Sequence, residues 1–78
     1  MKTTKLKPFY NEIIMRDQVL CGKISQALNK SLASVRYRMV PNNDERLTLP
    51  RIQDLIREHL DLKPNTIIIE EVETAAQL

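Results

Sequence analysis

Apolar residues recur at spacings of three and four along most of the chain, which is the period of one face of an α-helix. Ile24, Ala27 and Leu28 form one such face in the first half, and Ile52 and Ile56 belong to another in the second. On this basis we predict helices over residues 9–20, 23–29, 31–40 and 48–62. The expected fold is mainly α, a small bundle of about four helices.

The ends of these helices carry their own signals. Gly22 is the single glycine of the chain, and we expect it to end the first helix in the left-handed conformation that suits glycine. Thr48 is a candidate N-cap for the last helix, and Pro50 fits its first turn. That helix should stop near Leu62, because Pro64 disfavours a helical conformation in the residue before it.

A short β-strand is predicted after the last helix. Ile67, Ile68 and Ile69 follow one another directly, and such a run of β-branched residues is typical of a buried strand. A strand needs a hydrogen-bonding partner, and within the chain residues 3–6 are a weak candidate. We therefore expect the strand to pair with its copy in a second subunit, with Ile67, Ile68 and Ile69 at the interface of a homodimer.

The boundary between two of the predicted helices has turn chemistry. Asn29 tolerates a positive φ, and Ser31 is a good N-cap for the helix that follows. Together with Ile24-Ser25, Leu28 and Val35, these residues resemble the helix-turn-helix of the lambda repressor/Cro-like DNA-binding family.

Two positions depart from the pattern of that family. Lys30 and Arg38 stand where apolar residues are usual, so we expect Tyr37 or Met39 to take the place of Arg38 in the core. Such a replacement would rotate the second helix of the motif slightly. Which of Tyr37 and Arg38 then points outward is left open by the sequence.

The resemblance implies a bundle with a C-terminal strand and a transcriptional regulator of the phage or mobile-element type, a dimeric repressor. Helix 31–40 would enter the major groove of double-stranded DNA. The residues implied to contact bases are Ser31, Ala33, Ser34, Arg36 and Tyr37, and those implied to contact phosphates are Lys23, Lys30 and Arg38. Arginine bonds to guanine, serine donates to phosphate or base, and alanine meets a thymine methyl group.

Length and charge fit one small domain that attracts a polyanion. The chain has 78 residues; residues 1–40 carry eight basic and two acidic side chains, whereas residues 41–78 carry four and eight. We expect a basic N-terminal arm at 1–7, the helix-turn-helix domain at 8–72 and a disordered tail at 73–78. One cysteine, no apolar run long enough for a membrane and no secretory signal lead us to expect a cytoplasmic protein without membrane contact.

Other functions were weighed against DNA binding. Cys21 and His59 make no nucleophile–base or metal constellation, so we expect no enzymatic activity, cofactor, metal or small-molecule ligand. We read Cys21 as a packing residue and His59 as a partly exposed one. The alternative function is a helical protein-interaction or antitoxin-like module that does not bind DNA directly.

Overall fold

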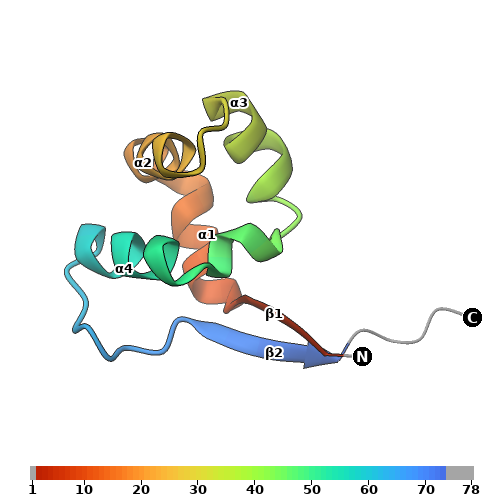
Figure 1. Ribbon diagram of the computed structural model, residues 1–78, viewed down its shortest axis with the longest axis vertical. Coiled ribbons are helices and arrows are strands. Elements are labelled where there is room, and N and C mark those ends of the chain that lie inside the picture. The colour runs from red at the N-terminus through yellow and green to blue at the C-terminus, as the bar shows by residue number, and fades with distance from the viewer. Residues whose placement is uncertain (1, 74–78) are drawn as a thin grey trace, which may run out of the picture.

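The computed structural model describes residues 2–73 and confirms a mainly helical fold with one short sheet (Figure 1). In chain order the elements are β1 (Lys2–Leu6), α1 (Pro8–Arg16), α2 (Gln18–Leu28), α3 (Leu32–Ser34), the π-helix η1 (Val35–Met39), the 3-10 helix η2 (Glu45–Thr48), α4 (Pro50–His59) and β2 (Ile69–Glu73). Among these residues, no helix has both the length and the apolar character needed to cross a membrane.

Asp17 divides the first predicted helix in two. Its backbone is extended, and its carboxylate accepts the N–H of Leu20 at 3.0 Å, which caps the start of α2. His59, at the end of α4, places its Nε2 atom 2.9 Å from the same carboxylate and ties the two helices together. The prediction of one helix over residues 9–20 that ends at Gly22 is therefore wrong. Gly22 lies inside α2 and has no positive φ.

The turn between α2 and α3 has the predicted chemistry. Asn29 takes the left-handed conformation, with φ 55° and ψ 45°, and the N–H of Lys30 donates to the Ser25 carbonyl at 2.9 Å. Ser31 then caps the next helix, because its Oγ accepts the N–H of Ser34 at 3.0 Å. Two short helices meet at a polar turn, as the sequence indicates.

The last helix is shorter than predicted at both ends. Pro50 occupies its first turn as expected, but Thr48 belongs to η2 and donates its hydroxyl to the backbone there at 2.6 Å, so it does not cap α4. The helix ends at His59 rather than near Leu62. Asp61 explains the early end, because it takes a left-handed φ of 57° that an α-helix cannot continue through.

One hydrophobic core joins most of these elements. α1, α2, η1, η2 and α4 bury apolar side chains, whereas α3 buries none; β1 adds Leu6, and Ile68 is buried just before β2. The buried apolar side chains are Leu6, Ile14, Leu20, Cys21, Ile24, Val35, Met39, Val40, Leu47, Ile52, Ile56 and Ile68. Met39, and not Tyr37, takes the core position that Arg38 leaves vacant.

The predicted C-terminal strand pairs within the chain. β2 runs antiparallel to β1, with Leu6 opposite Ile69 and Lys2 opposite Glu73. The basic arm predicted at 1–7 is thus a strand, because its lysines lie opposite the glutamates of β2 and its leucine reaches the core. Of the tail predicted at 73–78, Glu73 ends β2 and residues 74–78 lie outside the described part of the chain.

This pairing corrects the expectation that the isoleucine strand is completed by a second subunit. Ile68 is fully buried in the core of its own chain, and Ile69 begins β2 opposite β1. Ile67 precedes the strand and leaves 66% of its surface exposed. A strand partner from another copy is not needed to satisfy this backbone, since β1 supplies one.

Asn43 links the sheet to the helical part of the fold by two hydrogen bonds. It lies in the loop after η1 with a left-handed φ of 49°. Its side-chain oxygen accepts the N–H of Leu6 at 3.2 Å, and its side-chain N–H₂ donates to the carbonyl of Leu6 at 2.9 Å. The amide therefore satisfies both backbone groups of a buried strand residue, as a neighbouring strand would.

Candidate nucleic-acid interface

The exposed face of α3 and η1 forms a shallow surface hollow of about 400 Å³. Ser31 and Ala33 line it at the start of the helix, and Ser34, Tyr37 and Arg38 line it one turn further on. Tyr37 leaves 69% of its surface exposed, and Arg38 is exposed as well. The structure therefore brings together five of the residues that the sequence assigned to DNA, with both Tyr37 and Arg38 pointing outward.

The π-helix η1 explains how Arg38 reaches the surface. In a π-helix each N–H bonds to the carbonyl five residues earlier, and the N–H of Val40 donates to Val35 in this way at 2.9 Å. The wider turn stacks Val40 above Val35, and both side chains are buried together with Met39. Arg38 is thereby left on the outer side, so an arginine at an expected core position costs no buried charge.

Arg36 occupies a different position from the one predicted. It is half-buried and does not line the hollow, and its guanidinium carbon lies 5.6 Å from the centre of the Tyr37 ring. This distance fits a cation–π contact between neighbouring side chains. Arg36 is less exposed than Tyr37 and Arg38, because it lies on the flank of the helix where Val35 and Val40 are buried.

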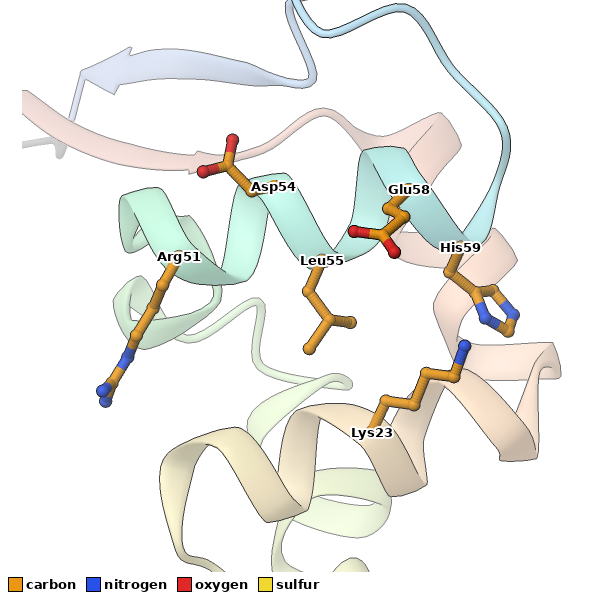
Figure 2. Close-up of a pocket in the computed structure, with 6 residues that line it drawn as sticks. All are labelled: Lys23, Arg51, Asp54, Leu55, Glu58 and His59. Carbon is orange, nitrogen blue, oxygen red and sulfur yellow. The ribbon is translucent and has the colours of Figure 1, made fainter.

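The two lysines assigned to phosphate lie in different surroundings. Lys30 is exposed in the turn before the hollow. Lys23 is exposed on α2 but lines a separate groove of about 550 Å³ between α2 and α4 (Figure 2). Lys23 extends toward the end of α4 where His59 lies, and Arg51 points away from it. Arg51 adds a second basic side chain to this groove and is absent from the residues predicted from the sequence. The sequence offers one indication of it, a basic residue directly after Pro50.

The stretch from α2 to the loop after η1 carries basic side chains and no acidic ones. From Gln18 to Asn43 the chain contains four basic residues, Lys23, Lys30, Arg36 and Arg38, and no acidic one. The basic arm predicted at residues 1–7 has an acidic neighbour, because Lys2 of β1 lies 3.8 Å from Glu71 of β2. The groove that Lys23 and Arg51 line also contains the acidic Asp54 and Glu58. The stretch with positive charge and no acidic residue of its own therefore runs through the turn, α3 and η1 rather than the N-terminal strand.

Comparison with known proteins gives no relative for this chain. No family model, curated protein or solved structure matches it. We therefore argue its function from the residues of the hollow and their surroundings.

Cys21, Asp17 and His59 have structural partners. Cys21 is buried, donates its thiol to the carbonyl of Ile14 at 3.2 Å, and has its pKa raised by burial. The N–H of Leu20 and then the hydrogen bond with His59 hold the pKa of Asp17 below its usual value. Among residues 2–73, no group of three or more histidine, cysteine or acidic side chains is placed to hold a metal ion.

Proposed function

We propose that this chain is a cytoplasmic DNA-binding transcriptional regulator, a repressor that lays α3 and η1 in the major groove of double-stranded DNA. The observation that carries the proposal is the hollow on α3 and η1, which exposes Ser31, Tyr37 and Arg38 within a stretch that contains basic residues and no acidic ones. A solvated helix face needs no such bias of charge, whereas contact with phosphates does.

Each residue of the hollow has a role that its chemistry supports. Arg38 has a long, exposed side chain and is our candidate for bidentate hydrogen bonds to guanine. Ser31 uses an oxygen lone pair to cap its helix, so its O–H is left to donate to a phosphate or a base. Ala33 presents a methyl group for the methyl of thymine. For Arg36 we propose a positioning role in place of a base contact, because its guanidinium lies against the ring of Tyr37.

Phosphate contacts would surround this face. Lys30 precedes the hollow in the turn and is the stronger candidate. Lys23 and Arg51 lie on the groove between α2 and α4, where Asp54 and Glu58 offset part of their charge. A repressor of this size reads two half-sites as a homodimer. Of the three isoleucines assigned to the dimer interface, Ile67 is the one with a largely exposed side chain, so we propose it as the interface residue among them.

The test is binding of a fluorescent duplex over a series of salt concentrations. The parent should bind, with an affinity that falls as salt rises, because released counterions drive the association. Lys30→Gln should lower the slope of log affinity against log salt by about one unit. Arg16→Gln is the matched control, because Arg16 is exposed on α1, outside the acid-free stretch, and it should change neither affinity nor slope.

Specificity is measured on a cognate duplex and a scrambled one. Arg38→Gln should lower affinity for the cognate duplex by about 1–3 kcal/mol and affect the scrambled duplex much less. An equal loss on both duplexes would reduce Arg38 to a phosphate contact. A parent protein that fails to bind any duplex at low salt would favour the alternative, a protein-interaction module.

A further inference from the structure

Within residues 2–73 the sheet has two strands, and no third strand lies beside the edge of β2 that faces away from β1. β1 lies between β2 and the helices, and β2 forms the outer margin of the molecule (Figure 1). We propose that this outer edge of β2 docks an extended, lysine-bearing segment of a partner protein, added as an antiparallel third strand. The proposal concerns a surface separate from the hollow on α3 and η1, and it does not depend on DNA binding.

The direction of the backbone groups on β2 follows from one hydrogen bond. The N–H of Lys7 donates to the carbonyl of Ile68 at 2.9 Å, so these opposed residues form a hydrogen-bonded pair. Such pairs alternate along an antiparallel ladder. Leu6 and Ile69 are therefore a non-hydrogen-bonded pair, as are Thr4 and Glu71 two residues further along the register.

Leu6 provides an independent check of this assignment. In a non-hydrogen-bonded pair, the N–H and C=O groups of both residues point away from the partner strand. Both groups of Leu6 do so, because Asn43 binds them from the side opposite β2. By the same geometry Ile69 and Glu71 direct their N–H and C=O groups toward the outer edge, where a further strand would bond them.

The outer edge of β1 is partly occupied. Asn43 binds both backbone groups of Leu6, and η2 packs against the strand. A third strand would therefore add beside β2. Figure 1 shows β2 on the side of the sheet away from the helices.

Charge selects the occupant of this edge. β2 reads Ile-Glu-Glu-Val-Glu, and its inner partner β1 reads Lys-Thr-Thr-Lys-Leu, with Lys5 opposite Glu70. The chain itself thus pairs this acidic strand with a basic one. Lys2 lies 3.8 Å from Glu71, but the three glutamates of β2 still outnumber the two lysines of β1. A second copy of β2 centred on the outer edge would place Glu71 against Glu71 of that copy, and like charges directly opposite are destabilising. A basic segment of another protein fits the edge, and a second copy of this strand does not.

The experiment is an NMR titration of the full-length, ¹⁵N-labelled chain with blocked synthetic peptides. One peptide contains the sequence of Lys2–Leu6, and its control has both lysines replaced by glutamate. We expect the basic peptide to slow hydrogen exchange at the Glu71 amide and to shift the signals of Ile69 and Glu71. The acidic peptide should do neither. The amides of Glu70 and Val72, which face β1, should stay protected throughout.

Two variants of Glu71 distinguish the contribution of its backbone N–H to peptide binding from the contribution of its charge. Glu71→Pro removes the outward N–H without removing a donor to β1, and proline is tolerated on an edge strand. It should weaken peptide binding by about tenfold or more, whereas Glu71→Gln keeps the N–H and should weaken it only a few-fold. Unchanged signals from the core residues would show that both variants fold.

Four results would overturn the proposal. They are no binding at millimolar peptide, equal binding of the acidic peptide, loss of protection at Glu70 and Val72 as the peptide displaces β1, and protection of Glu71 that rises with protein concentration alone. The last result would make a second copy the occupant. A chain that binds the peptide and no DNA would refute the proposed function while leaving this edge intact.

Discussion

Replacing Asn43 by alanine should strongly destabilise the fold. The substitution removes the acceptor and the donor that bind the two backbone groups of Leu6, at 3.2 Å and 2.9 Å. Leaving buried polar groups without partners costs about 1–3 kcal/mol. Alanine must also adopt the left-handed φ of 49°, which costs about 1–2 kcal/mol more. The expected loss is about 2–5 kcal/mol, a large share of the roughly 4–12 kcal/mol available to a chain of this length.

Urea unfolding followed by far-UV circular dichroism measures this loss. Asn43→Gly relieves the left-handed backbone and should recover about 1–2 kcal/mol of the alanine deficit. Asn42→Ala is the matched control, because Asn42 is the exposed neighbour in the same loop, and it should stay within about 0.5 kcal/mol of the parent. If the alanine and glycine variants of Asn43 both match the parent, the amide does not fasten the sheet. If glycine alone restores full stability, only the backbone conformation matters.

The other predictions concern single sites in the helical part. Gly22→Ala should raise stability by about 0.5–1 kcal/mol, because Gly22 lies inside α2 and an added Cβ meets no atom within 4 Å; a lower thermal midpoint would contradict this. Asn29→Gly should be neutral or slightly stabilising and Asn29→Val clearly destabilising, and equal midpoints would remove the left-handed turn. Because the folded-state pKa of Asp17 is lowered from its ordinary value of 3.8, the stability from its charge is complete above that value and is lost as the pH falls through the lowered one. Urea midpoints of the parent and Asp17→Asn should therefore converge in acid, and a gap that stays constant down to about pH 2 would contradict the assignment.

Local signals in the sequence were sufficient for the turn between α2 and α3. Asn29 and Ser31 act on groups within four residues of themselves, so their roles follow from residue type and order. The apolar stripe of α4 was equally readable, and Ile52 and Ile56 are buried as the spacing predicts. In these places, local propensity and tertiary packing favour the same structure.

The misplaced elements depend on residues that are distant in the sequence. β1 reads Lys-Thr-Thr-Lys-Leu and has no apolar face, and its partner is a glutamate-rich strand more than sixty residues later. Asn43 reaches Leu6 across 37 positions, and no spacing rule connects them. Asp17 was readable as an N-cap, but the apolar stripe that continues past it masked the signal. At the candidate site, the position of Arg36 depended on a π-turn that helical periodicity does not anticipate.

The most direct test of the proposed function is selection of bound DNA from a pool of random duplexes. The parent should enrich one consensus, and a homodimer should enrich it as a palindrome. The folded variant Arg38→Gln should relax the base preference at one position of each half-site while the rest of the consensus persists. A folded parent that enriches no sequence, at salt concentrations low enough for non-specific retention, would contradict the account.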